Sequence, residues 1–188
     1  MAHYRSEEEA LIGLARQLAD AYEEAKTDED REYAAEAIDG FLSDHDDHAP
    51  TEALVALLDL PLNKLTWPLV DSVENTLIER GWEVVEPLLA ATLGRVYDID
   101  GPVPLRARET MNGLSYAKLV FGLIDVIRGK ADDDLKRAAV HDLVALGDVA
   151  EPALLEALDH AVARPWAQDA LGDIRAAKEE AELQEELQ

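Results

Sequence analysis

The chain has 188 residues, of which 48% are apolar, and its 41 acidic side chains against 17 lysines and arginines give a net charge of −24. This length and apolar content are enough for a folded core. The negative charge argues against binding to nucleic acid or to an anionic membrane, because their phosphate groups attract basic surfaces. The absence of cysteine excludes disulfides, thiol nucleophiles, iron–sulfur clusters and cysteine zinc sites.

Neither a signal core nor a membrane span is apparent in the sequence. The first residues are polar, and charges interrupt every apolar stretch before it reaches the roughly 18–20 residues that a membrane helix needs. We therefore expect a cytoplasmic protein. The chain has 20 aspartates but only six lysines, which resembles proteins of salt-rich cytoplasms, where salt screens the repulsion between carboxylates. Halophilic adaptation is one explanation of this composition, and an ordinary acidic helical protein is the other.

The N-terminal sixty residues carry the pattern of amphipathic helices. Apolar residues at spacings of three and four, among them Leu11, Leu14 and Leu18, predict a first helix. The capping box formed by Ser6 and Glu9 would start it. This part of the chain has four basic and 17 acidic side chains.

A second helix is expected to begin at Thr27 or Asp28, whose side chains suit an N-cap, and to continue through Phe41. Gly40 and the polar run 43–48 would end it, and a short apolar helix follows Pro50. We interpret residues 1–60 as an acidic N-terminal helical cap, continuous with a repeat region at 61–188.

Glycines and prolines divide the rest of the chain into further helices. One is expected to start at Thr66, as the N-cap, with Pro68 in its first turn, and to end at Gly81, and another ends at Gly94. No segment alternates apolar and polar residues with a period of two, so we predict an all-α chain of about nine helices. The later helices are predicted near 104–112, 115–128, 133–146, 150–163 and 166–186.

Two segments of the chain resemble each other. Residues 86–93 and 151–158 both begin with Glu-Pro and continue with a leucine-rich helix, and each follows a glycine, Gly81 or Gly147, that ends the preceding helix. Residues 136–175 resemble the short HEAT-like repeats of phycobilisome lyases and many bacterial proteins, with a Leu-Gly ending in the first helix and a Leu-Leu core in the second. The resemblance implies a right-handed α-solenoid of stacked antiparallel helix pairs.

The polar run after the second helix contains candidate metal ligands, Asp44, His45, Asp46 and His48. Imidazole and carboxylate groups bind zinc, nickel or manganese, but no matching cluster occurs elsewhere, and a solvated loop is the competing interpretation. The sequence contains no glycine-rich phosphate loop, nucleophile elbow or kinase motif. We predict no catalytic residue and no cofactor.

Residues 95–137 are the least acidic part of the chain, with eight basic and seven acidic side chains. Within this region Arg106, Arg108 and Lys118 are candidates for contact with a protein partner, and pairing with the chain's own carboxylates is the alternative. Trp67, Trp82 and Trp166 lie at helix starts, where we interpret them as residues packed between helices. A role as a binding anchor is the alternative for each of them, and Trp82 is added to the candidates for partner contact.

These observations favour a non-enzymatic scaffold that presents a curved, acidic helical surface to a protein partner. A basic segment of that partner would be attracted by the acidic field, so that association slows as salt is added. The alternative hypothesis is a metal-dependent or cofactor-handling enzyme on the same HEAT-like scaffold.

Overall fold

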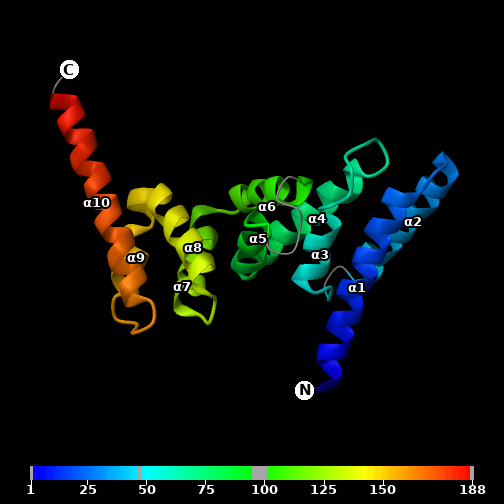
Figure 1. Ribbon diagram of the computed structural model, residues 1–188, viewed down its shortest axis with the longest axis horizontal. Helices are drawn as coiled ribbons and strands as arrows, with labels where there is room; N and C mark the ends of the chain where they lie inside the picture. Colours follow the sequence, from blue (N-terminus) through cyan, green and yellow to red (C-terminus); the bar gives the residue numbers. More distant parts are fainter. Residues whose placement is uncertain (1, 46–47, 95–100, 187–188) are drawn as a thin grey trace. The chain divides into compact units, whose positions relative to one another are not determined.

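The computed structural model describes residues 2–45, 48–94 and 101–186 (Figure 1). Within these ranges the regular structure consists of ten α-helices and two short 3-10 helices with no strand, which confirms the prediction of an all-α chain of about nine helices. No helix in the described ranges is both long and apolar enough to cross a membrane. The helices are α1 (Ala2–Glu24), α2 (Asp28–His45), α3 (Thr51–Leu57), α4 (Trp67–Arg80), η1 (Gly81–Val84), α5 (Val85–Thr92), α6 (Pro102–Gly113), α7 (Tyr116–Arg128), α8 (Asp133–Leu146), η2 (Gly147–Val149), α9 (Glu151–Ala157) and α10 (Arg164–Glu186).

The chain divides into two compact units, and each has its own packed interior. Unit 1 is Met1–Gly113, with α1 to α6, and unit 2 is Leu114–Gln188, with α7 to α10. Residues 1–60, interpreted from the sequence as a cap, therefore lie in the same unit as residues 61–113.

In unit 1, each helix packs against its neighbour in sequence and against the next helix but one. The sequential contacts join α1 to α2, α3 to α4 and α5 to α6, while the others join α1 to α3, α3 to α5, α2 to α4 and α4 to α6. The short helix α3 is the centre of this unit, because it also contacts α6 and buries every residue from Ala53 to Leu57.

Unit 2 has the same arrangement of contacts with four helices. Helix α7 packs on α8 and α9 packs on α10, while α7 also contacts α9 and α8 contacts α10. Its core contains Leu123, Ile127, Leu143 and Leu154, all of which are fully buried. The sequence resemblance placed α8 and α9 in one repeat, whereas the main partners of α8 are α7 and α10.

Several predicted helix boundaries are confirmed. The Thr27 hydroxyl accepts the N–H of Asp30 at 3.1 Å and so caps α2. Helices α4 and α8 end at Gly81 and Gly147, whose φ angles of 82° and 55° lie in the left-handed region that glycine adopts without strain. Each of these glycines leads into a 3-10 turn and then a new helix, so the two similar segments of the sequence have the same local structure.

Other boundary predictions are wrong. Helix α2 continues through Gly40 and into the polar run as far as His45, because a single glycine weakens a helix without ending it. Helix α1 begins at Ala2, so Ser6 lies inside it, because residues 2–5 include no residue that breaks a helix.

Helix α9 ends at Ala157 rather than near residue 163. Just after this end, Arg164 Nε donates to the Leu158 carbonyl at 2.8 Å and satisfies an acceptor that the helix leaves free. Helix α10 starts at Arg164, within two residues of the predicted start near 166.

Candidate functional site

The connection between α3 and α4, which we call the α3–α4 loop (residues 58–66), exposes large apolar side chains. Figure 1 shows it as an open loop standing clear of the helices that it joins. Leu62 is 58% exposed, Leu65 is 38% exposed, and Trp67, the first residue of α4, is 59% exposed. Apolar groups exposed so close together are more typical of a binding surface than are single scattered ones.

The backbone of the α3–α4 loop is held by hydrogen bonds around Asn63. The Asn63 Oδ1 atom accepts the N–H groups of Leu65 at 2.8 Å and of Thr66 at 3.2 Å. The Thr66 hydroxyl accepts the N–H of Asn63 at 3.2 Å and donates to the Pro61 carbonyl. Thr66 therefore precedes α4 as predicted, but its side chain closes the loop instead of capping the helix.

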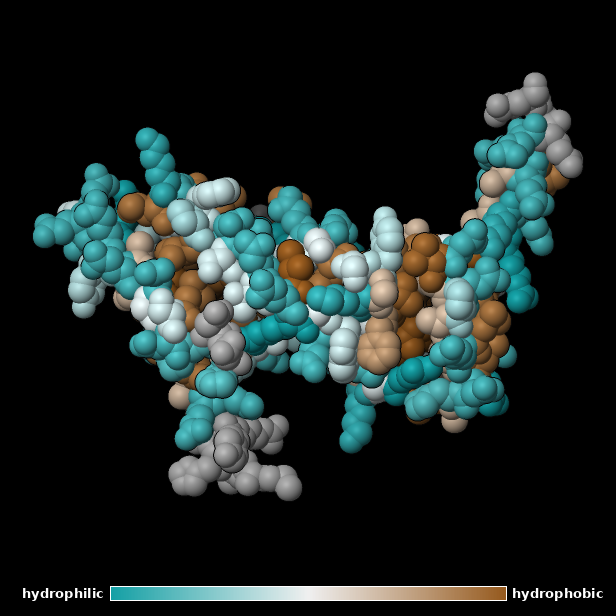
Figure 2. Space-filling view, turned by 180° about the vertical axis from the view of Figure 1, so that it is seen from behind, coloured by the Kyte–Doolittle hydropathy of each residue, from teal (hydrophilic) through white to brown (hydrophobic). Residues whose placement is uncertain are grey.

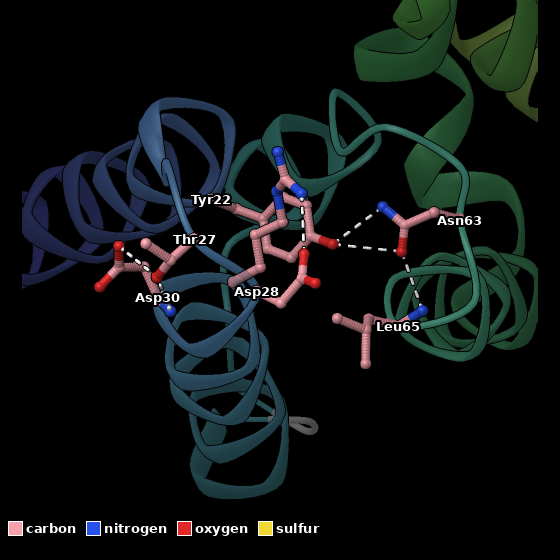
Figure 3. Close-up of polar contacts among 7 residues, drawn as sticks. Tyr22, Thr27, Asp28, Asp30, Asn63 and Leu65 are labelled. Atoms are coloured by element: carbon pink, nitrogen blue, oxygen red, sulfur yellow. Dashed lines mark hydrogen bonds and ion pairs between the residues drawn. The ribbon is translucent and has the colours of Figure 1, made fainter.

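A contact with α1 anchors the same asparagine. The Tyr22 hydroxyl, on a side chain that is 2% exposed, lies 2.8 Å from Asn63 Nδ2 and 3.1 Å from Asn63 Oδ1. Figure 3 shows the two side chains pointing toward each other, with the bond to Leu65 continuing from the amide. The position of the loop is thus determined by the core of unit 1, since Tyr22 belongs to that core.

Arg106 on α6 holds the other end of the α3–α4 loop. Its side chain is 6% exposed, and its guanidinium donates to the carbonyl groups of Leu58 and Leu60. These carbonyls follow the last residue of α3, where a helix leaves acceptors without a partner. Arg106, a candidate for partner contact in the sequence, therefore makes its hydrogen bonds inside unit 1 and positions the loop.

Carboxylates surround this buried guanidinium. Burial lowers the pKa of Arg106, and the charges of Glu74, Asp59 and Glu109 oppose that shift. Burial, and next the charge of Glu109, raise the pKa of Glu74, against the opposing effect of Arg106. Glu74 is consequently a carboxylate whose charged form the folded state disfavours.

Replacing Glu74 with glutamine is expected to stabilise the protein at neutral pH. The pKa of Glu74 is higher in the folded state than in the unfolded chain, so the folded state binds the proton more tightly. The charged form therefore destabilises the folded state at pH values above the folded pKa. This destabilisation disappears as the pH falls through the folded pKa. The difference in melting temperature between Glu74→Gln and wild type should shrink as the pH is lowered from about 8 to about 4. Thermal unfolding of both proteins across this range measures it, and a constant difference would contradict the assignment.

Two open grooves lie beside the α3–α4 loop. Both are surface depressions rather than enclosed cavities, which suits a protein segment better than a small molecule. Figure 2 shows one face of the molecule, where brown apolar areas lie between teal hydrophilic side chains. One groove is lined by Leu62, Asn63, Lys64 and Trp67. The other, between α2 and α4, is lined by Glu32, Ala35, Glu36, Asp39, Leu65 and Leu69.

The structure distributes the other predicted contact residues over both units. Arg108 is half-buried on α6, and Trp82 is 38% exposed in η1, so both belong to unit 1. Lys118 is exposed on α7 and belongs to unit 2. A contact surface made from these residues stays a prediction.

The candidate metal loop follows the end of α2. The His45 ring, at the last residue of α2, packs against the Phe41 ring with centroids 5.1 Å apart, while Asp44 and His48 are exposed. Asp46 lies outside the described residues. No group of three histidines or carboxylates that could hold a metal ion occurs in the part of the chain that the structure describes. The metal site and the solvated loop both stay interpretations of this segment.

The exposed residues of the α3–α4 loop were not recognised from the sequence, and the interpretation of Trp67 as a packing residue is wrong, since its side chain is 59% exposed. A usable signal was present. Pro61 and Pro68 enclose a segment too short for a helix, with Asn63 at a position suited to a turn. The apolar residues of such a segment have no helical face through which to be buried.

No protein-family model, no curated protein and no solved structure matches this chain. The assignment of a function therefore depends on the packing, charge and exposure of the chain's own residues. These single out the surface around the α3–α4 loop, where Leu62 and Trp67 are exposed and the exposed Leu65 lies beside the carboxylates of α2.

Proposed function

We propose that this chain is a non-catalytic, cytoplasmic interaction module that binds a protein partner through an acidic helical surface. The observation that carries the proposal is the α3–α4 loop, where Leu62, Leu65 and Trp67 remain exposed although the backbone beside them is hydrogen-bonded. Rigid apolar groups lose little conformational freedom on binding, so they make effective contacts with a partner.

We further propose that each unit is a short HEAT-like solenoid of stacked antiparallel helix pairs, as the sequence resemblance implies. The helix contacts support the pairs α1/α2, α3/α4 and α5/α6 in unit 1, and α7/α8 and α9/α10 in unit 2, in place of the α8/α9 pair of the resemblance. In support, the first helices of successive pairs contact each other, as do the second helices. Such stacking buries the apolar faces of helix pairs that could not bury them alone and leaves extended surfaces for binding.

The charge of the chain selects the chemistry of its partner. A net charge of −24 creates a negative field that attracts a basic segment of a protein and repels nucleic acid. Opposite charges on two proteins speed their encounter, and added salt weakens this effect. The partner of this module is therefore a protein with a basic segment.

Capture of a partner at two salt concentrations tests the proposed function. The immobilised protein is expected to retain a defined partner from the host cell at about 0.05 M salt, and the association rate measured by surface plasmon resonance should fall by about tenfold or more at about 0.5 M. An absence of partners at low salt, or an association rate that salt does not change, would contradict the proposal.

A further inference from the structure

The surface around the α3–α4 loop has the features of a preformed docking site. Within the loop, the N–H groups of Asn63, Leu65 and Thr66 all donate to side chains of the loop itself. The loop is also fixed at Tyr22 and at Arg106. The side chains of Leu62 and Leu65 are therefore held outward by a defined backbone and can contact a partner without reorganising it.

The α2 side of this surface is acidic, whereas Lys64 lines the groove of Leu62 and Trp67. Glu32, Glu36 and Asp39 on α2 are spaced by four and three residues, so they lie on one face of the helix. They line the groove that Leu65 and Leu69 also line, and all three are exposed. A partner at this groove would place apolar side chains on the leucines and positive charges beside the carboxylates.

Charge complementarity distinguishes between the possible occupants. A second copy of this chain would bring another net charge of −24 to the acidic α2 side, and an anionic membrane would be repelled in the same way. A helix that carries lysine or arginine next to a stripe of leucine-like residues can place its apolar side chains in the groove and its positive charges beside the carboxylates. Recognition of an amphipathic helix by an apolar groove is a common mode of peptide binding.

We propose that the α3–α4 loop, the start of α4 and the acidic face of α2 bind a basic amphipathic helix of a protein partner. Leu62, Leu65 and Trp67 contact its apolar stripe, while Glu32, Glu36 and Asp39 pair with its basic residues. This inference rests on the proposed function, because it identifies the surface and the partner chemistry of that interaction.

Two synthetic peptides test the inference directly. Both are helical, about five turns long, with an identical leucine stripe, and their polar positions carry lysine in one and glutamate in the other. Calorimetric titration is expected to show binding of the leucine–lysine peptide alone. Amide chemical shifts in the NMR spectrum of the full chain should change mainly at residues 32–39 and 61–69.

Matched variants separate this site from general attraction by an acidic protein. A triple variant, Glu32→Lys, Glu36→Lys and Asp39→Lys, and a double variant, Leu62→Ser and Trp67→Ser, should each weaken binding about tenfold or more. Their controls make equal changes at exposed positions of unit 2 and should alter affinity by less than about twofold. The controls are Glu179→Lys with Glu180→Lys and Glu182→Lys, and Leu155→Ser with Val162→Ser.

Several outcomes would overturn the inference. Equal weakening by the site and control variants would mean diffuse charge attraction, and equal binding of both peptides would mean an apolar patch without charge selectivity. Dimerisation in sedimentation experiments that Leu62→Ser with Trp67→Ser abolishes would make a second copy the occupant. If the protein bound vesicles of phosphatidylserine and phosphatidylcholine and the same variant abolished this binding, the occupant of the surface would be a membrane.

The failure of this inference differs from a failure of the proposed function. A partner captured in a salt-dependent way that binds the site variants as tightly as wild type would leave the interaction function standing and refute this surface. Site-specific binding of the leucine–lysine peptide without any captured partner would support the surface and contradict the proposed function.

Discussion

Replacing Arg106 with methionine is expected to lower the free energy of unfolding of unit 1 by about 2–4 kcal/mol, because two acceptors would lose a charged donor. Methionine keeps most of the apolar stem but leaves the carbonyl groups of Leu58 and Leu60 without their hydrogen bonds. Both leucines are fully buried, so water cannot easily replace the guanidinium. Urea denaturation followed by circular dichroism measures the change.

Two further variants show whether the hydrogen bonds cause this loss. Arg106→Lys keeps the charge but replaces the forked guanidinium with a single ammonium group, so its stability should lie between those of wild type and Arg106→Met. Arg16→Met changes an exposed arginine of α1 in the same unit and should have an effect within about 0.5 kcal/mol. Equal stability of Arg106→Met and Arg16→Met would refute the positioning role of Arg106.

Replacing Leu57 with alanine is expected to destabilise unit 1 by about 2–5 kcal/mol, the range observed when a buried leucine is truncated and a cavity remains. Leu57 is fully buried in α3, and that helix contacts α1, α4, α5 and α6. With helices on several sides, the structure can collapse only partly around the missing methyl groups. Hydrogen exchange should therefore accelerate across unit 1 much more than in unit 2.

The control for this variant is a leucine exposed in the same unit. Leu105 on α6 is 63% exposed, so Leu105→Ala should change stability by less than about 0.5 kcal/mol. Similar effects of the two replacements would mean that α3 is not the centre of the core. Uniform acceleration of exchange through residues 114–186 would mean that the two units unfold together.

The predictability of individual helices depended on the presence of local signals. Both ends of α8 were predicted to the residue. Gly147 ends the helix, and the structure shows that Asp132 caps its start by accepting the N–H groups of Asp134 and Leu135. The end of α9 has no such signal. The Leu158 carbonyl at this end accepts a hydrogen bond from Arg164, which lies beyond the following turn. The spacing of residues in the sequence does not reveal this contact.

The candidate site was harder to predict for a related reason. Arg106 was singled out as a basic residue in the least acidic region, but the sequence does not reveal that its side chain is buried beneath Leu58 and Leu60. Trp67 lies at the start of a helix, where we expected it to pack between helices, and it is nevertheless exposed. In both cases the role of the side chain depends on segments far away in the sequence.

Helical periodicity, glycine stops and an excess of carboxylates were enough to establish an acidic, all-α chain, because each of these properties is local to a few residues. Three-dimensional packing was needed to show that Asn63 is tied to Tyr22 and that Leu62 and Trp67 remain exposed. The exposure of a side chain is set by whatever else in the chain covers it. A partner surface made of exposed apolar residues can therefore be located only once it is known which apolar residues are buried in the core.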